Sequence, residues 1–425
     1  MNKPYQKFTF KNGLRLVTVP MRNTQAVTVL VLVGTGSKYE TKGINGISHF
    51  LEHMFLKGTK KRPNTLKLME PLDKIGGEYN AFTGQEYTGY WAKVDSKHID
   101  LALDWVSDIF INSKLDSSKI EREKGVITEE INMYLDTPMR YIMDLWDELL
   151  FGNQPAGWLI SGTKESISKL RRRHFIDYFK NHYSSYNTII AIAGNIEKIK
   201  NLKTKIKNYF KNINIKKPRA REKVIQNQIK PGILVHYKKT DQTHLCFGVR
   251  GYNLFHRDRY ILDILNAILG GGLTSRMWTE LRGKHGLVYY LFVINHNDLD
   301  VGFLLTHVGV NNERIEKTIS IILNQYKLIR DKKINSEELR KAKDLIKGRT
   351  ILSLEESNEQ ASFYAFQELL ENRILTLEQI FAKIEAVTAE DIQRVAKDIF
   401  RPEKLNLALI GPFKDKRKFE KLLKI

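Results

Sequence analysis

Two histidines and a glutamate lie close enough in the sequence to hold and use a metal ion. The stretch reads His49-Phe50-Leu51-Glu52-His53, and residues 43–57 around it carry apolar residues at helical spacing. In a helix, residues four apart project from the same side, so His49 and His53 suit one tetrahedral zinc. Glu52 is angled differently and could hold a water molecule instead of the ion. The order H-x-x-E-H reverses the common H-E-x-x-H zinc motif. Histidines on a helix can also be merely packed or capping side chains, so the motif alone leaves both interpretations open.

A third ligand is expected, because a catalytic zinc normally takes three protein ligands and leaves the fourth position to water. The candidate segment is residues 121–131, in a helix whose start at residues 116–118 offers an N-cap. Glu123 and Glu130 are two turns apart on one face, whereas Glu129 points about 100° away. This geometry favours Glu130 as a ligand, with Glu123 supporting a ligating histidine from behind. The alternative is a solvated acidic helix face.

The elements that position these residues belong to a chain of 425 residues, enough for two or three domains. Its 42% apolar and 28% charged residues are typical of a globular protein. No apolar run approaches the length of a membrane span, and the amino terminus lacks the apolar core of a signal peptide. The single cysteine, Cys246, excludes an intrachain disulfide framework and fits a reducing compartment. We therefore expect a cytoplasmic protein with no membrane partner.

The chain is strongly basic, with 69 Lys and Arg against 48 Asp and Glu and a formal net charge of +21. Such a charge can indicate a nucleic-acid or anionic-membrane partner. Here the basic residues are scattered, and short clusters such as 57–62 and 171–173 resemble loops and solvated helix faces. No aromatic-and-basic nucleic-acid module accompanies them. We therefore expect no nucleic-acid partner, and a basic nucleic-acid-binding protein remains the alternative that a steep salt dependence of DNA retention would support.

Internal repetition shows how the chain is organised. Three strand-like segments of the first half recur in the second, at separations of 219, 217 and 217 residues measured between matching positions. The pairs are residues 13–19 with 232–237, 25–30 with 242–247, and 190–194 with 407–411. Landmarks at nearly constant separation indicate a duplication.

Both halves show the same order of expected elements: strand, strand, helix, helix, strand pair, long helical stretch, strand, helix. Alternation over 86–94 predicts a strand, and helical periodicity covers 117–150 and 336–370. Strands and helices in separate blocks predict an α+β class, with each half a mostly antiparallel sheet covered by helices.

The expected domains are a zinc-binding half at 1–211, a linker at 212–231 and a homologous half at 232–425. The linker is polar and rich in lysine, contains Pro218, and has no sustained apolar period. Two-half architectures tend to place a binding site between the halves.

The segment from Gly46 to Phe55, followed by Lys57-Gly58-Thr59, resembles the first motif of the pitrilysin/insulinase zinc metallopeptidases, the inverzincins. The resemblance covers residues 5–420 and is greatest to the mitochondrial-processing-peptidase-like branch, in its bacterial type of single chain built from two related halves. It implies one Zn²⁺ per chain and two halves enclosing a chamber. The family's third ligand follows the second motif histidine by about 77 residues, which matches Glu130 ahead of Glu129. The same resemblance implies that Glu123 is the acid behind a ligating histidine.

The resemblance also implies a site for peptide. Residues 76–83 form a glycine turn entering a strand, and in the family this is an edge strand that receives the substrate as an added strand. The matching residues are Asn80, Ala81, Phe82 and Thr83. Without the resemblance, Phe82 would be interpreted as a core aromatic.

The second half has no H-x-x-E-H and is expected to hold no second zinc. Its glycine triplet at 270–272 is a weak phosphate-binding signal, because no P-loop Lys-Ser/Thr follows it. Arg282 and Tyr289 match the family's R-x₆-Y pair, which reaches the substrate from the second half. Some relatives divide the zinc motif and this pair between two chains. Since one chain carries both here, we expect a self-sufficient protomer in a homodimer, with pairing to a related chain as the alternative.

Together these features predict a zinc-dependent endopeptidase that hydrolyses peptides or unfolded polypeptide segments. His49, His53 and Glu130 are expected to bind zinc, and Glu52 to act as the general base. Tyr289 and Arg282 are expected to stabilise the oxyanion or to anchor the substrate backbone. A non-catalytic subunit of a peptidase pair is the alternative, and the intact Glu52 argues against it.

Overall fold

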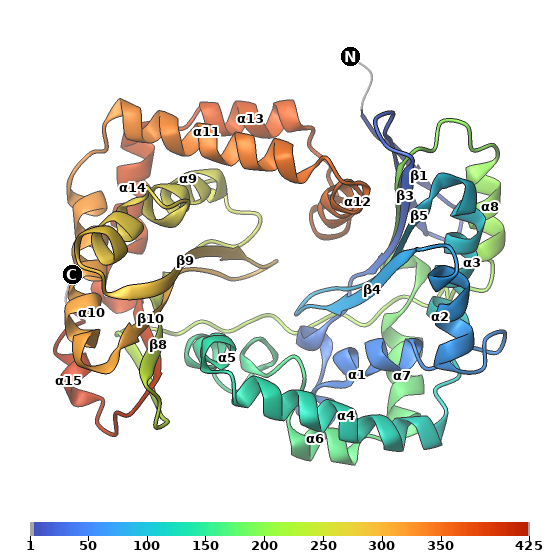
Figure 1. Ribbon diagram of the computed structural model, residues 1–425, viewed down its shortest axis with the longest axis horizontal. Helices are drawn as coiled ribbons and strands as arrows, with labels where there is room; N and C mark the ends of the chain where they lie inside the picture. The colour runs from blue at the N-terminus through green and yellow to red at the C-terminus, as the bar shows by residue number, and fades with distance from the viewer. Residues whose placement is uncertain (1–3, 424–425) are drawn as a thin grey trace. The chain divides into compact units, whose positions relative to one another are not determined.

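The structure of the chain is a computed structural model that describes residues 4–423. It divides into two units, each assembled from three stretches of sequence (Figure 1). Unit 1 contains residues 1–132, 159–222 and 351–376, and unit 2 contains residues 133–158, 223–350 and 377–425. Within residues 4–423, no helix is both long enough and apolar enough to cross a membrane.

Unit 1 is built on a six-stranded sheet in the order β1-β2-β6-β3-β5-β4. The central strand β3 is apolar apart from Thr28 and is buried on both faces, because helices cover both sides of the sheet. Its strands are β1 (Gln6–Thr9), β2 (Arg15–Pro20), β3 (Ala26–Val33), β4 (Glu78–Thr83), β5 (Thr88–Asp95) and β6 (Thr188–Gly194). Its helices include α1 (Ile47–Phe55), α2 (Thr65–Asp73), α3 (Ile99–Asn112), α6 (Lys164–Lys169), α7 (Arg172–His182), α8 (Leu202–Tyr209) and α12 (Ser357–Phe366), with most of α4 (Ser117–Leu135).

Unit 2 is built on a five-stranded sheet in the order β7-β11-β8-β10-β9. Its strands are β7 (Gly232–Tyr237), β8 (Gln242–Arg250), β9 (Val288–Asn297), β10 (Gly302–Asn311) and β11 (Leu405–Gly411). Its helices include α5 (Pro138–Phe151), α9 (Arg259–Gly270), α10 (Ile315–Asp331), α13 (Leu377–Glu385), α14 (Ala389–Ile399) and α15 (Arg417–Glu420), with most of α11 (Ser336–Ser353).

The two sheets have the same topology, apart from the additional strand β1. Strands β2, β3, β4, β5 and β6 of unit 1 take the places of β7, β8, β9, β10 and β11 in unit 2. In both sheets one pair is parallel, β2 with β6 and β7 with β11, and the remaining neighbours are antiparallel. The predicted α+β class with two related, mostly antiparallel halves is therefore confirmed.

The units depart from a contiguous division of the chain in two segments. Helix α5 comes from the first half of the sequence but packs on β7, β8 and β11, and α12 comes from the second half but packs on β2, β3 and β6 (Figure 1). Apolar side chains explain both placements: Trp146 lies in a cluster with Cys246 and Leu305, and Tyr364 in a cluster with Leu30. Each helix thereby covers a face of the sheet whose strands come from the other half of the sequence.

The two long helical stretches expected at 117–150 and 336–370 are each interrupted. Helix α4 ends at Leu135 and α5 begins at Pro138, whose ring is compatible with a first helical turn but not with a helix interior. Helix α11 ends at Ser353 and α12 begins at Ser357. Apolar periodicity continues across both breaks, so a period-based prediction joins helices that the structure separates.

Ion pairs of a buried glutamate also hold the segment that contains α12 in unit 1. The carboxylate of Glu368 has a fully buried side chain and lies 2.7 Å from Lys7 Nζ and 3.3 Å from Arg15 Nη1. Nearby, the hydroxyl of Tyr5 donates to the carbonyl of Ile374. Because an unpaired buried charge is strongly destabilising, these partners stabilise the position of residues 368–374 in unit 1.

Candidate metal centre and active site

Helix α1 carries the H-x-x-E-H motif and is shorter than the segment 43–57 expected from the sequence. It begins at Ile47, because Gly46 has φ +92°, a left-handed conformation that favours glycine. Gly46 has no side chain to cap the helix, and the buried carboxylate of Glu40 takes this role. It accepts the backbone N–H groups of Gly46 at 2.7 Å and Ser48 at 2.8 Å. Burial raises the pKa of Glu40 to about 7, against the opposing effect of these donors.

His49, His53 and Glu130 come together in unit 1, the first two from α1 and the third from α4. Glu130 Oε2 lies 3.6 Å from His49 Nε2 and 3.4 Å from His53 Nε2. One ligand atom from each residue lies within 4.8 Å of the others. Hydrogen bonds with His49 and His53 lower the pKa of Glu130 well below its usual value, so its carboxylate is ionised.

This geometry fits a zinc ion. Two ligand atoms about 2.1 Å from a tetrahedral ion are roughly 3.4 Å apart, close to the separations between Glu130 and each imidazole. Two imidazoles and one carboxylate are also the donor set of catalytic zinc sites that keep a position for water. When bound, zinc supplies Lewis acidity, which polarises a peptide carbonyl and lowers the pKa of water.

Glu123 supports His53 from the side away from Glu130. The Nδ1 atom of His53 lies 2.9 Å from Glu123 Oε1, and Lys57 Nζ lies 2.8 Å from the same oxygen. Burial alone would lower the pKa of His53, but its hydrogen bonds to Glu123 and Glu130 outweigh burial and raise it to about 9. Because Nδ1 is held by Glu123, the Nε2 atom is left to face a metal. In contrast, the buried Nδ1 of His49 has no hydrogen-bond partner among residues 4–423.

Glu52 is held by a residue of the edge strand. The hydroxyl of Thr83, at the end of β4, donates to Glu52 Oε2 at 2.5 Å. Glu52 therefore stands on the same helix as the two histidines, with one oxygen held by Thr83 and the other without a hydrogen-bond donor among residues 4–423. This arrangement suits a base that must keep a fixed orientation.

Strand β4 is the outermost strand at one end of the unit 1 sheet, so one of its edges has no strand partner in the part of the chain described. Asn80 is exposed and accepts the N–H of Ala81 through its own side chain. Phe82 turns inward: its ring packs near Tyr87 and Phe366 and lies across Gly89, where a Cβ would be 2.2 Å from the ring. The aromatic ring of Phe82 thus packs in the core, and only its backbone lies on the edge strand.

Arg282 and Tyr289 lie in unit 2 and contact each other. Arg282, in a π-helical turn, donates from Nη1 to the carbonyl of Val288 at 2.8 Å. Its guanidinium lies 5.5 Å from the centre of the Tyr289 ring, which is 77% exposed at the start of β9. The contact presents a cation and a phenol at one place on the surface of unit 2.

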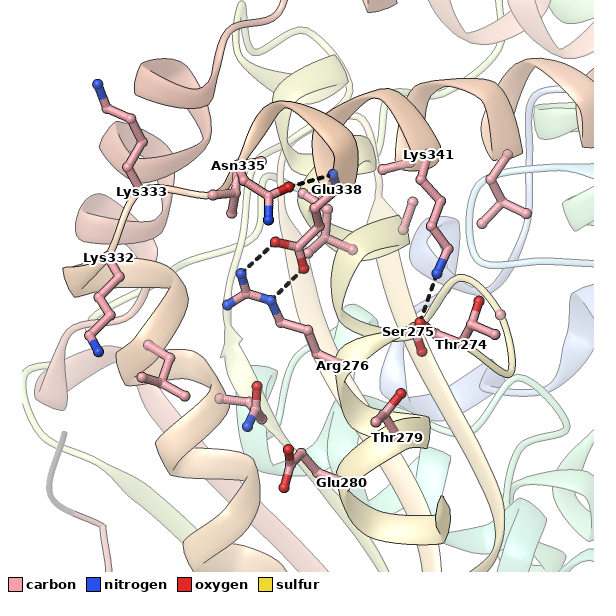
Figure 2. Close-up of a pocket in the computed structure, with 18 residues that line it drawn as sticks. Thr274, Ser275, Arg276, Thr279, Glu280, Lys332, Lys333, Asn335, Glu338 and Lys341 are labelled. Atoms are coloured by element: carbon pink, nitrogen blue, oxygen red, sulfur yellow. Dashed lines mark hydrogen bonds and ion pairs between the residues drawn. The ribbon is translucent and has the colours of Figure 1, made fainter. Parts of the chain in front are cut away.

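Unit 2 also contains a cavity of about 510 Å³ between α9, α10 and α11, and Gly272 of the glycine triplet contributes to its wall (Figure 2). Two of its cations already have partners. Arg276 binds both oxygens of Glu338 at 2.7 Å, and Lys341 donates to the carbonyl of Thr274 at 2.9 Å. None of the residues expected to act in chemistry lines this cavity.

Two contributions to the site have no local sequence signal. Glu40 precedes Ser48 by eight residues, whereas recognisable capping patterns span three, so no spacing rule identifies it. Thr83 is expected on the substrate strand, but its bond to Glu52 joins residues 31 positions apart. Both contacts depend on packing of α1 against its neighbours.

Comparison with known protein families assigns both halves of the chain. Residues 15–164 match the family described as insulinase, peptidase family M16, and residues 169–346 match the peptidase M16 inactive domain. An uncharacterized zinc protease of Bacillus subtilis is 34% identical over 96% of this chain and 98% of its own length. Another, from Streptomyces coelicolor, is 29% identical over 97% of this chain and 90% of its own length.

Solved structures agree on the fold. A protease from Helicobacter pylori has a TM-score of 0.88 and 24% identity, covering 96% of this chain and 99% of that one. A peptidase M16 inactive domain from Pseudomonas fluorescens has the same TM-score at 16% identity, over 96% and 98% of the two chains. With the His49, His53 and Glu130 cluster in place, the chain is a zinc-dependent peptidase and belongs to the insulinase family, peptidase family M16.

Proposed function

We propose that the protein is an endopeptidase that hydrolyses peptides or unfolded polypeptide segments, with Glu52 as its general base. One observation carries the proposal. Helix α1 places Glu52 next to His53 and about one turn from His49, the two histidines that share a carboxylate, and Thr83 of an edge strand holds Glu52 in orientation. A base beside a metal-ligand cluster and a free strand edge is the arrangement that peptide hydrolysis requires.

The chemistry assigned to Glu52 is proton transfer. Its carboxylate takes a proton from the attacking water and delivers it to the leaving amine. Thr83 holds one carboxylate oxygen, so the other is the one that exchanges the proton. Glu123 keeps His53 in the orientation in which its Nε2 is a ligand.

The substrate is proposed to lie along β4 as an added strand. Backbone groups of residues 80–83 would pair with an extended chain regardless of its sequence, and side-chain preference would come from neighbouring pockets. A folded domain cannot offer an extended segment, so unfolded chains and peptides are the expected substrates. Arg282 and Tyr289 are proposed to contact the same substrate, anchoring its backbone or stabilising the oxyanion.

We further propose that the protein acts in the cytoplasm as a homodimer. The zinc motif and the Arg282–Tyr289 pair occur in one chain, so a protomer needs no different partner to complete its set of functional residues.

The test measures the zinc content of two variants and the rate at which each cleaves unfolded casein, both against the zinc-loaded wild type. Glu52→Gln is expected to retain zinc and lose about 10²–10⁴-fold in turnover, because the base is lost but no ligand is. Glu130→Gln is expected to lose zinc. A tightly folded, loop-poor protein serves as a control that should resist wild-type cleavage. Near-wild-type rates in Glu52→Gln would refute the mechanism, and unchanged zinc content in Glu130→Gln would refute the ligand assignment.

A further inference from the structure

A groove of about 490 Å³ lies on unit 1 between β1 and α8, and four lysines line it. Lys203 and Lys207 are one turn apart on α8, Lys211 follows the end of that helix, and Lys11 lies beyond β1. No aspartate or glutamate lines the groove, and none of the four ammonium groups pairs with a carboxylate within residues 4–423. Like charges one helical turn apart repel, so an anion in the groove would relieve this repulsion.

The same groove has an apolar interior. Leu14 and Phe210 are buried at its wall, while the ring of Phe8 is 37% exposed. Phe8 packs edge-on against Phe10, with ring centres 4.9 Å apart. The ammonium of Lys203 lies 4.6 Å from the centre of the Phe8 ring. An occupant must therefore offer apolar groups as well as negative charge.

The free edge of strand β1 beside the groove distinguishes a polypeptide from a nucleic acid or a membrane as the occupant. Strand β1 is the outermost strand of the sheet at the end opposite β4, and its side away from β2 has no strand partner in the described chain. A polypeptide can use the N–H and C=O groups of a strand edge, whereas a nucleic acid has no matching backbone. A membrane surface is too flat to enter a groove.

We propose that this groove binds an extended, acidic polypeptide segment with apolar side chains, as a second substrate-binding site remote from the zinc ligands. That the bound segment belongs to a substrate rests on the proposed peptidase function, whereas the binding of an acidic polypeptide does not. It also accounts for part of the +21 net charge, since four of the lysines become ligands for acidic chains.

The topology limits which substrates can use both sites. Strands β1 and β4 are five inter-strand steps apart, and segments bound outside their two free edges are seven steps apart, which at about 4.8 Å each is roughly 34 Å. An extended chain needs about ten residues to cover that distance. The acidic segment must therefore lie at least about ten residues from the bond that is cut.

Binding is tested with the zinc-loaded full chain carrying Glu52→Gln, so that the probe is not cleaved. The probe is a fluorescein-labelled peptide of alternating glutamate and phenylalanine, followed by anisotropy. Lys203→Gln with Lys207→Gln is expected to weaken binding at least about tenfold, and added salt should weaken binding to the parent protein. The matched control is Lys180→Gln with Lys217→Gln, which removes two exposed lysines of unit 1 outside the groove and should change the affinity less than about twofold.

Equal affinity in the groove pair and the control pair would overturn the proposal. The proposal would also be overturned if the protein bound oligothymidylate or phosphatidylglycerol vesicles more tightly than the peptide and the Lys203→Gln, Lys207→Gln variant lost that binding. The occupant of the groove would then be a nucleic acid or a membrane.

A kinetic measurement on the protein with an intact Glu52 separates this proposal from the proposed function. For a cleaved substrate with a distant acidic segment, the groove pair should raise KM and leave kcat unchanged, and the same substrate without the segment should show no change. A KM effect of equal size on both substrates would refute the remote site. Absence of cleavage of every substrate would refute the peptidase function, while the anisotropy result would still decide the groove.

Discussion

At the scale of single residues, the hydrogen bond from the Thr83 hydroxyl fixes the orientation of the Glu52 carboxylate. Thr83→Val keeps the branched shape that suits a strand but removes the donor to Glu52. We expect kcat/KM to fall about tenfold, since one hydrogen bond to a charged group contributes about 1.5–3 kcal/mol, part of which water can replace. Zinc content should not change.

Thr83→Ser is the matched control, because it retains the hydroxyl while losing the methyl group. It should recover most of the activity lost in Thr83→Val. If valine and serine reduced the rate equally, Thr83 would act through strand packing and its bond to Glu52 would be irrelevant to catalysis.

Zinc must compete with a proton at His53. The hydrogen bonds to Glu123 and Glu130 raise the pKa of His53 to about 9 in the metal-free protein, against the effect of burial. The protonated form predominates below this pKa and cannot bind metal, so zinc affinity should rise with pH and level off above about 9. Calorimetric titration of the metal-free protein with zinc, in buffers of different ionisation enthalpy, should show proton release near neutral pH.

Glu123→Gln tests the origin of this competition. Loss of the carboxylate should lower the pKa of His53, so the rise in zinc affinity should shift to lower pH. A zinc affinity that is flat from about pH 6 to pH 9 would contradict the proton competition.

At the scale of elements, helix α1 depends on Glu40 for its beginning. Glu40→Ala would leave the N–H groups of Gly46 and Ser48 buried without an acceptor. We expect a loss of about 1–3 kcal/mol in the free energy of unfolding and weaker zinc binding, because the helix that carries both histidines would fray at its start. Urea unfolding and a competitive zinc chelator measure the two effects.

Glu197→Ala is the control for Glu40→Ala, because Glu197 is an exposed partner of Arg22. Its cost should stay within about 0.5 kcal/mol. Similar stability losses in the two variants would show that Glu40 has no special role in α1.

At the scale of the whole molecule, variants of Tyr289 and Arg282 test the proposed part of unit 2 in the chemistry. Tyr289→Phe removes only a hydroxyl from an exposed ring. If Tyr289 contacts the substrate, kcat/KM should fall about 10–10³-fold with zinc content and melting temperature nearly unchanged. Arg282→Ala should mainly weaken peptide binding, but it also removes the bond to the carbonyl of Val288, so its stability must be measured alongside.

The contrasting outcome identifies a packing role. A lower melting temperature with normal activity per folded molecule in Tyr289→Phe would mean that the pair only stabilises the entry into β9. Loss of rate without loss of stability would support a part for unit 2 in catalysis.

The features that depend on local geometry follow from the order of the residues alone. Residues four apart on a helix face the same way in any fold, so the joint projection of His49 and His53 follows from their spacing. Apolar alternation and repetition likewise predicted two related sheets, because buried strands need the same side-chain pattern wherever they occur.

Contacts between residues far apart in the chain follow instead from the way in which the helices and strands pack. The bonds of Glu40 to α1 and of Thr83 to Glu52, and the inward turn of the Phe82 ring, each require two elements to pack in a particular way. The same holds for α5 and α12, whose amphipathic patterns show that they need a sheet but not which sheet. The physical reason is that periodicity records how much apolar surface an element must bury, while the identity of the surface that buries it depends on the whole fold.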